Sequence, residues 1–167
     1  MKLRDMTRCG VLAAVLAVCA WLSVPLGDQA VSLQSFGVFL ALGLLGGRGG
    51  TVTVLVYLLL GAAGVPVFSG FRGGISVLLG PTGGYLWGFL LGSVLFWMLE
   101  RRLHQALNMS LAMVLCYLCG TIWYYYMYST GSVWPVLMIC VLPYLVPDAL
   151  KIILALTLSQ RLKKLMR

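Results

Sequence analysis

The chain has 167 residues, of which 61% are hydrophobic and only 10% are charged, and its formal net charge is +8. Its mean hydropathy is +0.99. A soluble domain of this size would need more charge to cover its surface, so the composition excludes that class and predicts an integral membrane protein with one domain, residues 1–167.

Six apolar runs are long enough to cross a hydrocarbon core of about 30 Å, which takes roughly 17–25 helical residues. They predict an all-α fold with six transmembrane helices, at about residues 9–25, 31–47, 51–67, 81–99, 107–127 and 133–158. The last run contains Pro135, Pro143 and Pro147. Because proline fits best in the first turn of a helix, we expect a short outer segment up to about Val146 and a spanning helix that begins near Pro147.

The lysines and arginines predict the orientation of these helices. Ten of the twelve fall on one side, namely Lys2, Arg4, Arg8, Arg48, Arg101, Arg102, Arg161, Lys163, Lys164 and Arg167. Cytoplasmic loops carry the excess of Lys and Arg, so we expect both termini in the cytoplasm. Aromatic residues between Trp123 and Trp134 fit the opposite interface. The net charge thus follows from topology, with some attraction to anionic membrane lipid, and requires no nucleic-acid partner.

A glycine-rich, irregular sequence joins the third and fourth runs. It comprises the end of residues 57–68, then Gly73-Gly74, then Gly80-Pro-Thr-Gly-Gly-Tyr85. Irregular backbone cannot face lipid, because unpaired N–H and C=O groups are too costly there, so this segment must line a cavity or be covered by protein. It predicts the substrate site of a transporter.

Within this region, some glycines have a competing role in packing. Gly80, Gly84, Gly88 and Gly92 recur at i+4 spacing, which is typical of close helix contacts in membranes, and we expect Gly88 and Gly92 to serve packing. The candidates for shaping the pocket are Tyr85, Gly70, Gly73, Gly74, Gly83 and Gly84, with Gln34 as a polar contact from the second run.

Two cations do not follow the topological pattern. Arg72 lies in the glycine-rich region, and Lys151 lies in an apolar helix three residues after Asp148, which places both groups of that pair on one helical face. An ionisable group within a span indicates a functional site. The alternative is a self-contained salt bridge at the helix start, where the helix dipole also favours Asp148. A substrate contact explains the pair better, because the desolvation of a buried ion pair can exceed its Coulombic gain.

Several motifs in one order carry a family resemblance. They are Leu33-Gln-Ser-Phe36, residues 57–68, Gly73-Gly74, Gly80-Pro-Thr-Gly-Gly-Tyr85 with Gly88-Phe89, and Pro143 followed by Pro147-Asp-Ala-Leu-Lys151. From about Gln34 to Lys151 the chain resembles the BioY family, the biotin-binding S components of energy-coupling-factor (ECF) transporters.

The resemblance implies an S-component bundle of six helices with a biotin pocket open to the outside, in the plasma membrane of a bacterium or archaeon. It also implies a coupling module of one transmembrane T protein and two cytosolic ATPases. The chain has no Gly-x-x-x-x-Gly-Lys-[Ser/Thr] phosphate loop, so we expect the energy to come from a partner or from a gradient.

By the same resemblance, Asp148 and Lys151 match positions that contact the vitamin. Lys151 suits the carboxylate of biotin and Asp148 suits a ureido N–H, although one helical turn between them places both near one end of the ligand. The pair and an anionic ligand sum to one negative charge, so a second cation is expected, and Arg72 is the candidate. The alternative for Arg72 is an exposed loop arginine near the lipid headgroups.

The first run carries Ala13 and Ala17 at i+4 spacing, with Gly10 and Ala14 beside them. The resemblance implies that this alanine motif docks the T protein. Taken by itself the motif indicates little, because small residues are common in any packed membrane helix.

The remaining chemistry does not indicate an enzyme. Cys116 and Cys119 form a Cys-x-x-Cys pair, yet no second pair or nearby histidine completes a zinc site, and the one histidine, His104, lies in a basic loop. No acid–base dyad, nucleophile motif or metal cluster is present in the sequence, so we expect no catalytic residue and no cofactor. The open alternatives are an S component for another vitamin, a solitary biotin carrier, and a membrane scaffold without transport.

Overall fold

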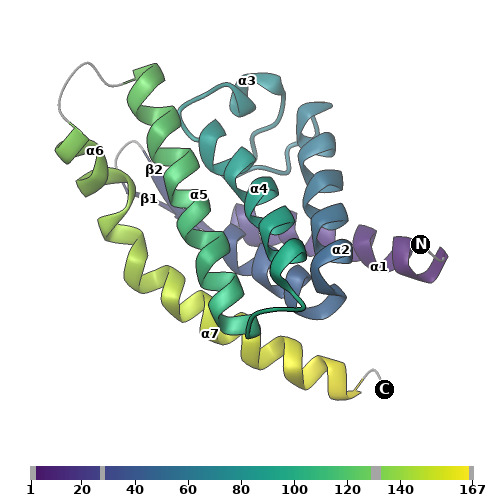
Figure 1. Ribbon diagram of the computed structural model, residues 1–167. Helices are drawn as coiled ribbons and strands as arrows, with labels where there is room; N and C mark the ends of the chain where they lie inside the picture. Colours follow the sequence, from purple (N-terminus) through teal and green to yellow (C-terminus); the bar gives the residue numbers. More distant parts are fainter. Residues whose placement is uncertain (1–2, 27–28, 129–132, 166–167) are drawn as a thin grey trace.

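The computed structural model of the chain describes residues 3–26, 29–128 and 133–165 (Figure 1). Its helices are α1 (Leu3–Trp21), α2 (Gln34–Ala62), α3 (Ile75–Leu78), α4 (Gly83–Leu99), α5 (Gln105–Tyr128), α6 (Val133–Cys140) and α7 (Leu142–Leu165). Two short antiparallel strands, β1 (Ser23–Leu26) and β2 (Gln29–Ser32), pair with Ser23 opposite Ser32.

This hairpin corrects the all-α prediction, because the fold is nearly but not wholly helical. It occupies the end of the first predicted span and the start of the second. Proline lacks the N–H that a helix needs and disfavours helical backbone in the residue before it, so Pro25 fits the end of α1 better than its continuation.

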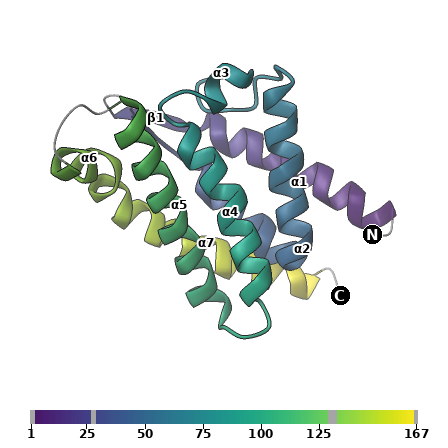
Figure 2. The ribbon, with the colours of Figure 1, turned by 45° about the horizontal axis from the view of Figure 1, so that its top comes forward.

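The helices form a bundle in which α4 packs along α5, α1 packs along α2, and α7 crosses α2 and α5 (Figures 1 and 2). Its core contains fully buried side chains from four of these helices, among them Leu16, Phe39, Tyr57, Phe96 and Met109. Outward-facing side chains of α5 and α7 are also apolar, such as Leu118 and Leu154, which are 53% and 59% exposed. An apolar exterior of this kind suits contact with lipid.

Helix α2 bends sharply, so that its two segments, 34–45 and 47–62, correspond to the second and third predicted spans. The bend lies at Gly46, whose φ of 74° and ψ of −179° are not helical. The second segment begins at Gly47, whose N–H donates to Glu100 Oε2 at 2.8 Å, so the Glu100 carboxylate caps this helix start. A Cβ at Gly47 would overlap the backbone of Trp97, which is why glycine is needed here.

Within the described part of the chain, three helices are long and apolar enough to cross a membrane. They are Gln34–Ala62, Gln105–Met127 and the stretch Val136–Lys164, and Gly83–Leu99 is a shorter apolar helix. This count takes the bent α2 as one helix.

The last predicted span breaks earlier than expected. Helix α7 begins at Leu142, and Pro147 lies inside it, so the prediction of a helix start near Pro147 was wrong. Pro143 occupies the first turn, where its missing N–H is not needed, whereas Pro147 gives up one backbone hydrogen bond within the helix. The break falls at Val141, whose N–H still donates to the carbonyl of Leu137 at 3.0 Å.

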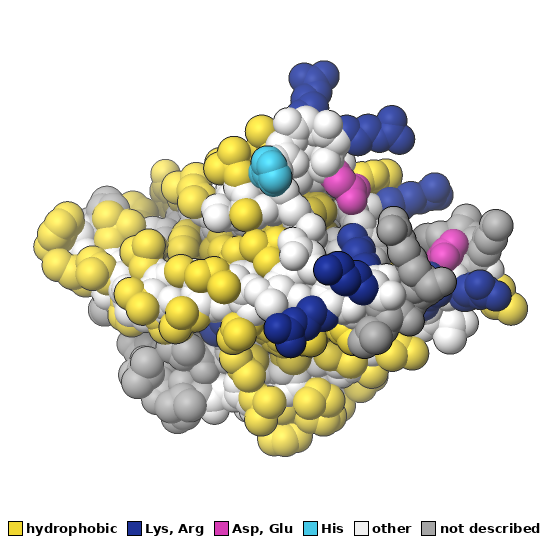
Figure 3. Space-filling model, turned by 90° about the horizontal axis from the view of Figure 1, so that it is seen from below, with side chains coloured by type: hydrophobic (Ala, Val, Ile, Leu, Met, Phe, Trp, Pro, Cys, Tyr) yellow, Lys and Arg dark blue, Asp and Glu magenta, His cyan; other side chains and the backbone are white. Residues whose placement is uncertain are grey.

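The bend of α2, the α4–α5 loop and the end of α7 lie at one end of the bundle (Figures 1 and 2). Figure 3 looks onto this end, where lysine and arginine side chains gather beside hydrophobic flanks. We call it the basic end, defined by Arg48, Arg101, Arg102, Arg161, Lys163 and Lys164. The other end carries the loop between α2 and α4, residues 63–82, called here the α2–α4 loop.

Replacing Glu100 tests its role as a helix cap. We expect Glu100→Ala to lower the free energy of unfolding by about 1 kcal/mol, because the N–H of Gly47 loses its acceptor. Glu100→Gln keeps an acceptor oxygen and should cost less. Thermal unfolding of the purified variants in detergent measures both, and equal losses for the two variants would contradict the capping role.

Candidate functional site

A pocket lies at the end of the bundle opposite the basic end, between the start of α2, the α2–α4 loop, and the facing sides of α4, α5 and α7. Its polar wall comes from five separate parts of the chain, and the residues used below are Ser32, Gln34, Ser35, Ser69, Arg72, Tyr85, Tyr117, Asp148 and Lys151. The two candidate residues on α7 and Gln34 are therefore brought together, with Arg72 and Tyr85 on the same pocket wall.

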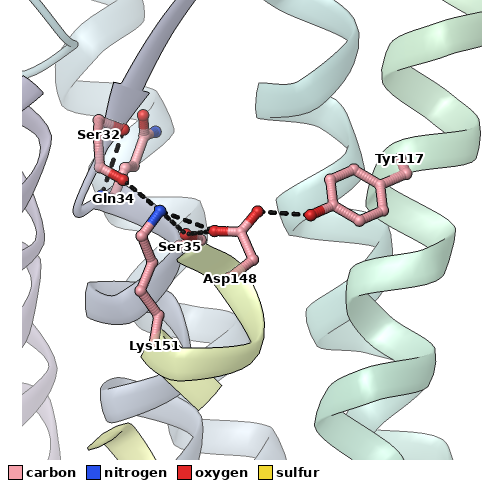
Figure 4. Close-up of polar contacts among 6 residues, drawn as sticks. All are labelled: Ser32, Gln34, Ser35, Tyr117, Asp148 and Lys151. Atoms are coloured by element: carbon pink, nitrogen blue, oxygen red, sulfur yellow. Dashed lines mark hydrogen bonds and ion pairs between the residues drawn. The ribbon is translucent and has the colours of Figure 1, made fainter. Parts of the chain in front are cut away.

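The ammonium group of Lys151 makes all of its hydrogen bonds to other groups of the protein. The side chain is buried, and Nζ lies 2.7 Å from Asp148 Oδ1, 2.8 Å from the carbonyl oxygen of Ser32 and 3.3 Å from Ser35 Oγ (Figure 4). An ammonium group has three N–H donors, and these three acceptors occupy all of them. Lys151 thus joins α7 to β2 and to the first turn of α2.

Asp148 is held on both carboxylate oxygens. Oδ1 accepts from Lys151 and from Ser35 Oγ, the latter at 2.8 Å, while Oδ2 accepts from Tyr117 OH at 2.6 Å (Figure 4). A carboxylate offers about four acceptor positions, so Oδ2 retains one for a ligand. The arrangement can therefore present an oriented acceptor to an N–H donor.

Gln34 contributes a hydrogen-bond donor to the pocket, whereas Asp148 contributes an acceptor. Its side chain is buried, Oε1 accepts from Ser69 Oγ at 3.4 Å, and Nε2 has no partner in the part of the chain that the structure describes. A buried donor without a partner costs about 1–3 kcal/mol. The pocket is therefore suited to a ligand that brings a hydrogen-bond acceptor to Gln34.

Arg72 lies on the α2–α4 loop at the pocket and is exposed. Its Nε donates to the carbonyl of Ser69 at 3.2 Å, and its two Nη groups have no hydrogen bond to any other described residue. A tight turn presents it, because the N–H of Phe68 donates to the carbonyl of Arg72 at 2.9 Å across three residues. Two N–H-bearing nitrogens are thus left for an anion.

The candidate glycines allow the backbone to turn or to pack closely, and they do not line the pocket. Gly70 and Phe71 have φ of 73° and 57° in the turn before Arg72, and the ring of Phe71 stacks on Trp21 with centroids 5.0 Å apart. Gly74 has φ of 99°, and its N–H donates to the carbonyl of Gly61 at 2.7 Å. The candidate Gly70 therefore shapes the turn and is not among the residues that line the pocket.

The other candidate glycines lie at tight backbone contacts. A Cβ at Gly73 would overlap the carbonyl of Val65, and one at Gly83 would overlap that of Leu78. In α4, a Cβ at Gly84, Gly88 or Gly92 would meet Trp123, Cys116 or Ala112 of α5. These last three glycines let α4 and α5 pack closely.

Ala13 and Ala17 do not face outward. They are 2% and 5% exposed and pack in the core beside α2, whereas Gly10 and Ala14 on the same helix are exposed. A Cβ added at Gly10 would meet no atom within 4 Å. The outward small-residue positions of α1 are therefore the neighbours of the predicted pair.

Ser35, Ser69 and Tyr117 are site residues that the sequence did not identify. Ser35 lies inside the motif quoted for the family resemblance, and Tyr117 is a polar-tipped residue in the middle of an apolar run. Their roles depend on which helices meet, which spacing within one helix cannot show. Among the described residues, no group of three or more His, Cys, Asp or Glu side chains is placed to hold a metal ion.

The ion pair predicts a strong asymmetry between single and double variants. Lys151→Met leaves the buried Asp148 without its cation, which should cost about 3–5 kcal/mol of stability. The double variant Asp148→Asn, Lys151→Met removes both charges and should unfold at a higher temperature than Lys151→Met alone. Thermal unfolding in detergent compares them, and additive losses would show that the two groups are not coupled.

Similarity to known proteins identifies the family and the fold of this chain. The model of the BioY family matches residues 1–167. Over 100 residues the chain is 47% identical to the biotin transporter BioY of Thermotoga maritima, a match that spans 60% of this chain and 59% of that protein. It is 34% identical to the probable biotin transporter BioY of Pyrococcus horikoshii, over 98% of both chains.

A solved structure has the same fold. The crystal structure of the S-component for biotin from an ECF-type ABC transporter superposes with a TM-score of 0.86 at 26% identity, covering 96% of this chain and 91% of that chain. With the family model matched along its whole length, the chain is a multi-pass membrane protein that belongs to the BioY family.

Proposed function

We propose that the chain is the biotin-binding S component of an ECF transporter and that it mediates biotin uptake. The observation that carries this proposal is the pocket around Asp148, a buried carboxylate whose orientation is fixed and which keeps one acceptor position open. The relatives named as biotin transporters and the solved biotin S-component support the choice of ligand.

The polar groups of the pocket match the polar groups of biotin. Asp148 Oδ2 accepts a ureido N–H, and the unpartnered Nε2 of Gln34 donates to the ureido carbonyl. Apolar residues of the same pocket, Phe68, Leu86 and Phe89, cover the bicyclic ring and its sulfur. Tyr85 also lines this pocket.

Arg72 is the cation of the pocket that can bind the carboxylate of biotin. Asp148 and Lys151 form a neutral pair, and all three donors of Lys151 are used within the protein. The Nη groups of Arg72 are uncommitted in the described structure, and a guanidinium binds a carboxylate through two parallel hydrogen bonds. The positive charge of Arg72 then balances the negative charge of the biotin carboxylate, so no uncompensated charge stays in the pocket.

The positive charge of the basic end indicates how the chain is oriented in the membrane. We place this end in the cytoplasm, because positive residues are enriched on that side, and the pocket then opens to the outside. Six crossings are formed by α1, the two segments of α2, α4, α5 and α7, with both termini inside. The membrane is the plasma membrane of a bacterium or archaeon.

The proposed partners are a transmembrane T protein and two cytosolic ATPases. The T protein docks on α1, where Gly10 and Ala14 face outward next to the buried Ala13 and Ala17. Exposed small residues allow the close helix approach that drives association in lipid.

Three other functions would use parts of the same structure. An S component for another vitamin would keep the pocket and change the ligand, and a solitary biotin carrier would keep the ligand and dispense with the ATPases. A membrane scaffold without transport would have no use for a buried charge pair beside Gln34, whose Nε2 has no partner among the described residues.

Equilibrium binding of labelled biotin to the purified chain in detergent tests the proposed function. We expect tight binding by the wild type and its loss in Asp148→Ala and Lys151→Ala, because each substitution removes or releases the oriented carboxylate. Competition by unlabelled vitamins separates biotin from other ligands. A folded wild type that binds no biotin would refute the assignment.

A matched pair of ligands tests the role of Arg72. Arg72→Ala should weaken biotin binding by about 10- to 100-fold, since a hydrogen bond to a charged group contributes about 1.5–3 kcal/mol. Biotin amide, which lacks the negative charge, should bind the wild type and Arg72→Ala with nearly equal affinity. An unchanged preference for the acid in Arg72→Ala would show that another group binds the carboxylate.

Substitution at Gly10 tests the docking face. Because a Cβ there meets no atom, Gly10→Leu should fold and bind biotin normally. Co-purification with a co-expressed T protein and ATPases should be lost. Val114→Leu, at an exposed position of α5, is the matched control and should retain the partners. Intact assembly of Gly10→Leu would exclude this face as the docking site.

A further inference from the structure

Aromatic side chains of three helices hold the backbone of the α2–α4 loop. Each donates a hydrogen bond to a loop carbonyl, and the pairs are Trp21 Nε1 with Pro66 at 2.8 Å, Tyr57 OH with Val67 at 3.0 Å, and Trp123 Nε1 with Gly80 at 3.1 Å. All three acceptors lie near the two ends of the loop. The turn that carries Arg72, at residues 68–72, therefore depends on other contacts for its position.

Phe71, the residue before Arg72, has an unusual backbone conformation. Among the described residues it is the only one other than glycine with a positive φ, at 57°. A bulky side chain rarely adopts this conformation, which persists only where the surrounding structure holds it. The ring is also 65% exposed, so burial in the core does not explain it. An outlier of this kind beside a binding pocket indicates a functional constraint.

The contact that holds Phe71 comes from Trp21, the last residue of α1. The two rings are stacked, with centroids 5.0 Å apart and an angle of 24° between their planes. The same indole donates its N–H to the carbonyl of Pro66, so one side chain contacts the loop at two points five residues apart. Ala20, beside Trp21 on α1, is fully buried, which gives the indole a rigid support.

The other side of the turn is fixed in the core. Phe68 is buried, and its ring packs edge-on against Tyr57 with centroids 5.5 Å apart. The N–H of Phe68 donates to the carbonyl of Arg72, which closes the turn. Arg72 lines the pocket, whereas its neighbour Phe71 stacks on α1. The guanidinium is thus carried by a turn that is supported at two places, one in the core and one at the end of α1.

We propose that Trp21 is a positioning residue for the ligand carboxylate, because it holds the turn that presents Arg72 to the pocket. The inference rests on the proposed function, which gives Arg72 the carboxylate of biotin. A turn that is ordered before the ligand arrives loses less entropy on binding, so Trp21 strengthens binding of the acid. Trp21 is not among the residues that line the pocket, and recognition of the ureido group does not depend on it. It therefore sets the preference for an anionic ligand over a neutral one.

Equilibrium binding of labelled biotin and of biotin amide to the purified chain in detergent tests this proposal. Trp21→Ala should weaken biotin binding by about 2- to 10-fold, the range expected for loss of one aromatic stack, and should leave binding of the amide unchanged. Trp21→Phe keeps a ring for Phe71 and should retain most of the preference for the acid. In the Arg72→Ala background, Trp21→Ala should cause no further loss.

Two more variants separate positioning from folding. Phe71→Ala changes an exposed side chain, so it should fold, and it should show the same selective loss of biotin binding as Trp21→Ala. Trp97→Ala removes a tryptophan from α4 that is 47% exposed and lies outside the pocket lining, and it should bind both ligands as the wild type does.

The possible results distinguish this proposal from the proposed function. Equal weakening of biotin and of the amide in Trp21→Ala and Phe71→Ala would show general support of the fold and would overturn the positioning role. Unchanged binding of both ligands in these two variants would overturn it as well, as would losses that add to that of Arg72→Ala. A folded wild type that binds no biotin would instead refute the proposed function.

Discussion

The structure depends on keeping one carboxylate, Asp148, charged and buried inside a bundle made for lipid. Taking a carboxylate out of water costs several kcal/mol even in a relaxed protein, and only an ion pair supported by further hydrogen bonds offsets that cost. Lys151, Ser35 and Tyr117 supply these contacts, and Ser32 satisfies the remaining donor of Lys151. The pocket is therefore also a junction between β2, α2, α5 and α7.

Close helix contact makes such a junction possible. Gly84, Gly88 and Gly92 bring α4 against α5, and Gly46 with Gly47 lets α2 turn back along the bundle with Glu100 at the turn. Packing through small residues replaces the hydrophobic effect, which does not hold helices together in lipid. The glycines thus position Tyr85 and Tyr117 at the pocket without lining it.

The sequence predicted what depends on spacing within one segment. Asp148 and Lys151 are three residues apart on one helix, so their common face follows from helical geometry, and the structure shows the pair at 2.7 Å. Tyr117 and Ser35 were not predicted, because their role depends on which face of α5 and which end of α2 meet α7. The start of α7 was misplaced because Pro143 and Pro147 could each occupy the first turn of a helix, and their spacing alone did not distinguish them. The hairpin was missed because four-residue strands between apolar runs leave little periodic signal.

The two cations of the pocket differ in how they are held. Lys151 is buried and has no donor left, so it stabilises Asp148 whether or not a ligand is bound. Arg72 is exposed on a turn with positive φ at Gly70 and Phe71, and among the described residues its side chain makes one hydrogen bond, through Nε. A ligand carboxylate bound to Arg72 would therefore attach to the α2–α4 loop, while its N–H groups attach to the rigid junction. Binding that joins a fixed site to a loop costs ordering entropy on the loop side alone.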